Sequence, residues 1–215
     1  LCRLAAYRFP LTLNATTRAM LKASAAFEPG ANGADMLAVA GDTPDPAAAD
    51  RLSNIPYRNA LLRTTCVATL ISGGHAENAL PQRATANINC RIFPGVPVET
   101  VRAELEKVIA DPAVKVNTDP DASASDASPL RPDVVAAVTK AVHARAPGLP
   151  IIPSMSAGAT DSYHFRIQGV PSYGVAGLFS KASDSYAHGL NERVPVDAIA
   201  PALAHWDSLL RDLSK

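Results

Sequence analysis

Residues that could bind a metal or an anion lie toward the C-terminal end of the chain. His188 precedes Gly189 in a polar loop, and a proline-started amphipathic helix follows from about residue 195. A fixed loop backbone presents the imidazole with little steric cover, which suits a metal ligand. A lone histidine identifies neither the metal nor a second ligand. The alternative to a metal ligand is therefore a histidine that lies on the surface or is hydrogen-bonded within the protein.

A turn of small and polar residues lies about one short α/β unit upstream, at Gly158-Ala159-Thr160-Asp161-Ser162. A turn of this kind before a helix has free backbone N–H groups that can bind a carboxylate. The alternative is that the turn only caps the helix that follows it. The residues by themselves favour neither interpretation.

Four separated motifs resemble, in the same order, motifs of the M20 family of zinc metallopeptidases. From the N-terminal side they are Asn78-Ala79-Leu80-Pro81 with residues 84–95, residues 156–162, Gly169-Val170-Pro171-Ser172-Tyr173-Gly174, and residues 187–192 with Val194-Pro195-Val196. The resemblance covers most of the chain from about Thr64 onward. Four motifs in family order are far more specific than any one of them.

The resemblance implies a role for each of the polar residues in these motifs. His188 corresponds to the family's C-terminal zinc ligand, and residues Gly158, Thr160 and Asp161 belong to the loop that contacts substrate near the metal. A neutral imidazole supplies one bond to zinc, whereas catalytic sites use about three protein ligands. The resemblance therefore implies that this chain alone does not hold zinc and is inactive.

Two further residues correspond to substrate-binding residues of the family's lid domain. Asn78 resembles the asparagine that helps to bind substrate or to stabilise the oxyanion, and Arg91 resembles the arginine that grips a substrate carboxylate. Without the family, Asn78 would be read as an Asx-turn residue and Arg91 as part of a solvated strand face. Gly74-His75-Ala76 looks like the segment of the catalytic lid histidine, but it lies too close to Asn78, so His75 is interpreted as a loop residue.

In the M20 fold, as the resemblance implies, an α+β (ferredoxin-like) lid interrupts an α/β catalytic domain. We expect residues 1–118 to form the lid or dimerisation domain, partial at its start and with a helical insertion at about 17–59. Residues 119–215 are expected to be the second half of the catalytic domain. The first half, with most of the zinc ligands and the acidic general base, is expected to lie outside this chain, which would then be a C-terminal fragment.

The implied reaction is hydrolysis of a peptide or N-acyl amide bond in a small substrate, as in carboxypeptidases, dipeptidases or aminoacylases. Zinc is the implied cofactor, with two ions in the intact enzyme, and the implied partner is a second copy that pairs through the lid. Two alternatives stay open. The chain could be a non-catalytic dimerisation and substrate-contact module, or an unrelated α/β binding domain.

Local patterns predict the elements that would position these residues. Ala-rich and amphipathic runs predict helices, β-branched runs predict strands, and a Pro/Asp/Ser stretch over 119–129 predicts a linker. The predicted helices span 17–26, 33–40, a short stretch ending near 52, 98–110, 132–146, a start at 162, and 196–213. The predicted strands span 64–71, 84–92, 114–116, 149–153 and 172–175.

Composition and charge exclude two classes of partner. The 20 basic and 20 acidic residues give no net charge, and no basic cluster offers the positive field that nucleic acid requires. No run approaches the ~20 apolar residues that cross a bilayer.

The three cysteines are too few for a disulfide framework and have no CxxC spacing. Cys66 and Cys90 fall in strands that could be neighbours, so a bridge between them is one interpretation. Buried free thiols are the interpretation that the sequence favours. The compartment therefore stays open.

Overall fold

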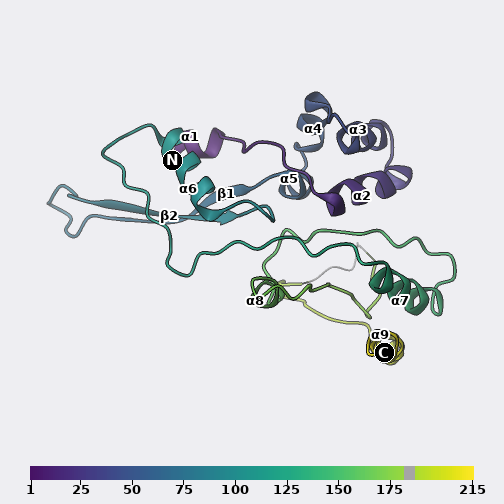
Figure 1. Ribbon diagram of the computed structural model, residues 1–215. Helices are drawn as coiled ribbons and strands as arrows, with labels where there is room; N and C mark the ends of the chain where they lie inside the picture. Colours follow the sequence, from purple (N-terminus) through teal and green to yellow (C-terminus); the bar gives the residue numbers. More distant parts are fainter. Residues whose placement is uncertain (182–186) are drawn as a thin grey trace. The chain divides into compact units, whose positions relative to one another are not determined.

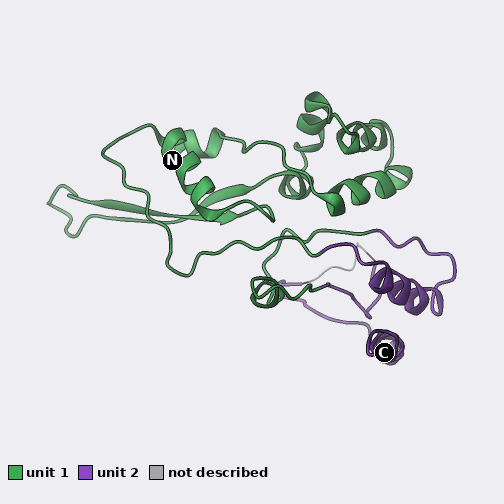
Figure 2. Ribbon diagram, in the orientation of Figure 1, with its two compact units in different colours: residues 1–128, 153–172 green, residues 129–152, 173–215 purple. Residues whose placement is uncertain are grey.

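The computed structural model describes residues 1–181 and 187–215, and the chain divides into two compact units (Figure 2). Unit 1 comprises Leu1–Ser128 and Pro153–Ser172, and unit 2 comprises Pro129–Ile152 and Tyr173–Lys215. The expected domain boundary near residue 118 stays a prediction.

Unit 1 contains a helical cluster between the first helix and the first strand (Figure 1). After α1 (Cys2–Ala6), the chain forms α2 (Ala15–Ser24), the 3-10 turn Ala25–Phe27, α3 (Ala31–Ala40), α4 (Pro46–Leu52) and α5 (Pro56–Leu62). Each of α2 to α5 packs against the next. The buried side chains of this cluster include Met20, Leu21, Met36, Val39, Leu52, Leu61 and Leu62.

Polar side chains explain where two of these helices begin. The Asn14 side chain accepts a hydrogen bond from the Thr17 backbone N–H, and the Thr17 hydroxyl accepts one from the Asn14 N–H, both at 2.9 Å. This capping box satisfies two otherwise orphaned donors. Asp45 caps α4 by accepting from the Ala47 N–H at 2.8 Å. The three predicted helices of this region are confirmed, whereas α5, which starts at a proline without a side-chain cap, was missed.

An ion pair joins α3 to α4 inside the cluster. Asp35 is buried, and it accepts bonds from Nε of Arg51 at 2.9 Å and from Nη2 at 2.6 Å. The guanidinium lowers the pKa of the Asp35 carboxyl, mainly through these hydrogen bonds.

The only sheet among the described residues is an antiparallel hairpin of β1 (Thr65–Gly73) and β2 (Ala84–Arg91), followed by α6 (Val98–Ile109). Its register pairs Thr65 with Arg91 and Gly73 with Ala84, with an irregularity between Ala68 and Leu70. α6 packs against α1. Phe9, Val101 and Leu105 form a small core between these elements. Both strands and α6 are confirmed, but the strand predicted at 114–116 is wrong.

Tyr7 connects the segment after α1 to α6. Its hydroxyl donates to Oε1 of Glu104 at 2.5 Å, and its ring meets Phe9 edge-on. Burial, together with the hydrogen bond and negative charge of Glu104, raises the pKa of Tyr7 from 10.0 to about 12. Unit 1 therefore holds this phenol neutral where a free tyrosine would ionise.

Titration of Tyr7 should be separable from that of the other tyrosines. Because its folded pKa is raised, its contribution to stability is complete below pH 10 and is lost as the pH rises toward about 12. We expect tyrosinate absorbance of the folded protein to show a late step near pH 12 that Tyr7→Phe removes. If the Tyr7→Phe variant still shows the late step in tyrosinate absorbance above pH 10, this interpretation is wrong.

Unit 2 is built on two helices that pack against each other, α7 (Pro132–His143) and α9 (Ile199–Leu213). The 3-10 turn Val196–Ala198 directly precedes α9. Lys140 of α7 bonds both carboxylate oxygens of Asp212 of α9, at 2.9 and 2.7 Å. The buried residues of α9 are Ala202, His205 and Leu209.

Two predictions for the C-terminal half are wrong. The runs 149–153 and 172–175 form no strand in the structure, because a strand requires a hydrogen-bonded neighbour and neither run is paired with one. Of the large apolar residues of α9, only Leu209 is buried. Ile199, Leu203, Trp206, Leu210 and Leu213 are exposed. Among the described residues, no helix is long and apolar enough to span a membrane.

Candidate substrate-binding and metal-ligating residues

The β1–β2 hairpin carries two of the predicted substrate residues, at its opposite ends. Asn78 lies in an exposed turn of the loop 74–83, which also contains His75. Arg91 is the last residue of β2 and pairs with Thr65 at the base of the hairpin. Ala84 to Arg91 is seven steps of extended chain, or roughly 23 Å. One hairpin therefore does not bring Asn78 and Arg91 into a single small site.

The Arg91 guanidinium is available to a ligand. The residue is exposed, and none of the described side chains forms a hydrogen bond or ion pair with it. Other arginines of unit 1 are engaged, such as Arg51 with Asp35 and Arg102 with Glu99. An unpaired guanidinium on a strand end can donate two parallel N–H bonds to the oxygens of a carboxylate.

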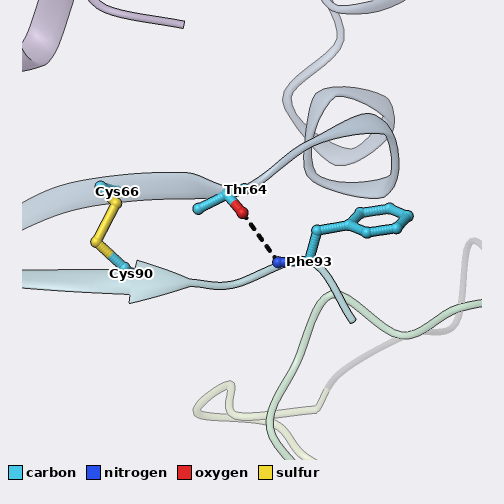
Figure 3. The surroundings of a disulfide bond; sticks show 4 residues. All are labelled: Thr64, Cys66, Cys90 and Phe93. Carbon is cyan, nitrogen blue, oxygen red and sulfur yellow. Dashed lines mark hydrogen bonds between the residues drawn. A yellow bond between two sulfur atoms is a disulfide. The ribbon is translucent and has the colours of Figure 1, made fainter. Parts of the chain in front are cut away.

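A disulfide adjoins Arg91, and it corrects the expectation of free thiols. Cys66 and Cys90 are directly opposite each other in the ladder and are bonded, with their Cα atoms 4.1 Å apart (Figure 3). Cross-strand neighbours lie about 4.5–5.5 Å apart, which is within reach of a disulfide. The predicted adjacency of the two strands was the sequence feature that pointed to this bond.

The turn before α8 (Ser162–Arg166) carries three more of the predicted substrate residues. Gly158, Thr160 and Asp161 are exposed, and the Gly158 N–H is bonded to the Ser156 hydroxyl at 3.1 Å. Asp161 occupies the N-cap position, but its carboxylate makes no capping bond. The carboxylate is therefore not used for helix capping, which was the alternative role for this turn.

His188 lies in an exposed turn of unit 2 with φ 62°. Non-glycine residues rarely adopt a positive φ, although histidine does so more often than most. The beginning of its motif, Ser185 and Tyr186, lies outside the described residues.

The donor set around His188 does not fit a zinc site by itself. Within residues 1–181 and 187–215, no group of three or more His, Cys, Asp or Glu side chains could hold a metal ion. Catalytic zinc takes about three protein ligands, so one imidazole is insufficient.

Comparison with known proteins finds relatives that are named as a synthase/hydrolase and as a probable carboxypeptidase. The chain is 28% identical over 162 residues to the N-fatty-acyl-amino acid synthase/hydrolase PM20D1 of Xenopus tropicalis, covering 73% of this chain and 31% of that protein. It is 36% identical over 66 residues to the probable carboxypeptidase S-like 2 of Dictyostelium discoideum, covering 31% of this chain and 13% of that protein. The chain thus spans less than a third of these relatives.

The fold is similar to that of a solved structure, an M20 family metallo-carboxypeptidase, Sso-CP2, from Sulfolobus solfataricus. The TM-score is 0.60 at 17% identity, over 93% of this chain and 45% of that one. The likeness confirms the mixed α/β and α+β fold class. Residues 5–117 match the peptidase dimerisation domain of the M20 family. Since that match covers more than half of the chain, the chain belongs to the M20 peptidase family.

Proposed function

We propose that this chain is part of an M20-type hydrolase that cleaves a peptide or N-acyl amide bond in a small substrate. The match of residues 5–117 to the peptidase dimerisation domain carries this proposal. The names of the relatives add chemical detail. An N-acyl amino acid and a carboxypeptidase substrate both have a free carboxylate next to the amide bond to be cleaved.

Arg91 is the residue that we assign to this carboxylate. Its guanidinium is exposed and lacks a partner among the described residues, so binding a substrate breaks no existing ion pair. Two parallel N–H donors match the two oxygens of a carboxylate. This contact would orient the substrate with its amide bond at a fixed distance from the strand end.

Asn78 would act on the other side of the amide, by donating its side-chain N–H to the carbonyl oxygen as negative charge develops there. Because Asn78 and Arg91 lie at opposite ends of one hairpin, we infer that a second copy brings them together. A homodimer through the lid would place the Asn78 loop of one copy near the substrate that the other copy holds.

The exposed turn at Gly158, Thr160 and Asp161 would contact the substrate near the metal, and His188 would be one ligand of that metal. The remaining ligands and the acidic general base would come from outside this chain, so this chain alone is expected to be inactive. In this family zinc activates water and polarises a carbonyl when it is bound.

The test compares this chain with the product of its whole gene. We expect the gene product to contain stoichiometric zinc and to hydrolyse dipeptides or N-acyl amino acids, and this chain alone to do neither. His188→Ala in the gene product should abolish both, whereas His143→Ala, at a histidine of α7, should abolish neither. If the His188→Ala protein keeps its zinc and activity, the metal assignment fails.

A non-catalytic dimerisation and substrate-contact module is the second candidate. The observation in its favour is that the family match falls on the dimerisation domain rather than on a metal site. A gene product that forms dimers in sedimentation measurements, and yet binds no zinc and hydrolyses no substrate, would support this candidate over the enzyme.

A further inference from the structure

The Cys66–Cys90 disulfide is a covalent bond between the two strands at the base of the hairpin. Farther along, Nδ2 of Asn87 donates a hydrogen bond to the Thr69 hydroxyl across the strands at 2.7 Å. The two cysteines are partly buried and pack against the small core of Phe9, Val101 and Leu105. Beyond Cys66, every residue of β1 from Val67 to Gly73 is exposed. The disulfide is therefore where the hairpin joins the core of unit 1.

Burial specifies the strand register only weakly beyond this point, because β1 is exposed throughout and β2 alternates exposed residues with the half-buried Ala86 and Ile88. A slip of one residue normally moves apolar side chains from a buried face to solvent, and that cost is what fixes a register. Val67, Leu70 and Ile71 are already 63%, 69% and 68% exposed, and they do not alternate with buried residues. A two-stranded sheet without a buried face is marginally stable in water.

A hydrogen bond also joins the segments that flank the two strands at the base of the hairpin (Figure 3). The Phe93 backbone N–H donates to the Thr64 hydroxyl at 3.0 Å, and both residues are buried. This bond lies outside the ladder, on the core side of the disulfide. It holds the two chain segments together at their exit from the core, but it does not constrain the exposed arm.

We propose that the Cys66–Cys90 disulfide is a covalent register lock for the hairpin, closed in an oxidising compartment and opened by a dithiol reductant. Opening transfers two electrons and two protons from the reductant, so that the disulfide becomes two thiols and the reductant becomes a disulfide. Structural disulfides persist in secreted, periplasmic or endoplasmic reticulum proteins. The proposal goes beyond the proposed function and does not depend on it.

The first test counts thiols in protein taken from its native cells, with thiols trapped by a maleimide during lysis. Each adduct is located by peptide mass spectrometry, and we expect the exposed Cys2 to be labelled before reduction and Cys66 and Cys90 only after it. In Cys2→Ser, Cys66 and Cys90 should again be labelled only after reduction. Labelling of Cys66 and Cys90 before reduction in the native protein would contradict an oxidising compartment.

The second test measures amide hydrogen exchange with and without dithiothreitol. Reduction should speed exchange in β1 and β2 by at least about tenfold, while amides of α3 keep their rates. Cys66→Ser with Cys90→Ser should exchange like the reduced protein, and Cys2→Ser like the oxidised one. If the double serine variant unfolds, exchange is measured on Cys66→Val with Cys90→Val instead, because valine keeps apolar side chains against the core. Hairpin rates that stay unchanged after the bond is lost would overturn the lock.

Discussion

Replacing Arg63 with alanine should lower the free energy of unfolding of unit 1 by about 3–5 kcal/mol. Arg63 is 6% exposed and bonds two separate segments, with Nη1 donating to the Phe9 carbonyl and Nη2 to the Ser53 hydroxyl, both at 3.0 Å. Alanine would remove both charge-assisted bonds and leave a buried carbonyl without a donor. Urea denaturation followed by far-ultraviolet circular dichroism measures the loss.

Arg63→Met separates the hydrogen bonds from the packing. Burial lowers the pKa of Arg63, which shows that the protein environment disfavours its charge. Methionine keeps much of the aliphatic stem and removes the cost of burying that charge, so we expect a smaller loss than for alanine. Arg83→Ala, at an exposed arginine, should change stability by less than about 0.5 kcal/mol. If Arg63→Ala and Arg83→Ala have the same urea midpoint of unfolding, the hydrogen bonds of Arg63 do not stabilise unit 1.

Elements with strong local determinants were predictable from the sequence. Asn14 and Asp45 cap their helices as their residue types indicate, and the β-branched run 64–71 forms a strand. Both depend on interactions within a few residues. The predicted strands 149–153 and 172–175 are different, because a strand is defined by a neighbour and the local run does not provide one.

The disulfide and the separation of the site residues also depend on long-range geometry. Two thiols in adjacent strands form a bond only in the register that places them opposite each other, and the sequence alone does not fix that register. The same register puts Arg91 at the base of the hairpin and the Asn78 loop at its end. The residue types for substrate binding could be read from the motifs, whereas their arrangement required the fold.

Replacing Arg91 with alanine in the product of the whole gene should lower kcat/KM for substrates with a free carboxylate by about 100-fold or more. Charge-assisted hydrogen bonds contribute about 1.5–3 kcal/mol each, and each 1.4 kcal/mol is a factor of ten. Because the carboxylate is bound equally in the ground and transition states, the change should fall mainly on KM. Steady-state kinetics with an N-acyl amino acid measures it.

A substrate pair and two matched variants make this expectation specific. The same N-acyl amino acid with its carboxylate converted to an amide should be hydrolysed equally by the parent and by Arg91→Ala, because it has no charge to bind. Arg91→Lys should recover only part of the loss, since an ammonium keeps the charge without the planar pair of donors. Arg83→Ala, at the other exposed arginine near β2, should leave the hydrolysis of both substrates unaffected.

Arg91 is exposed and unpaired among the described residues, so its removal should not lower the melting temperature. If Arg91→Ala slows both substrates alike, Arg91 does not bind the carboxylate, and the loss reflects a disturbed hairpin instead.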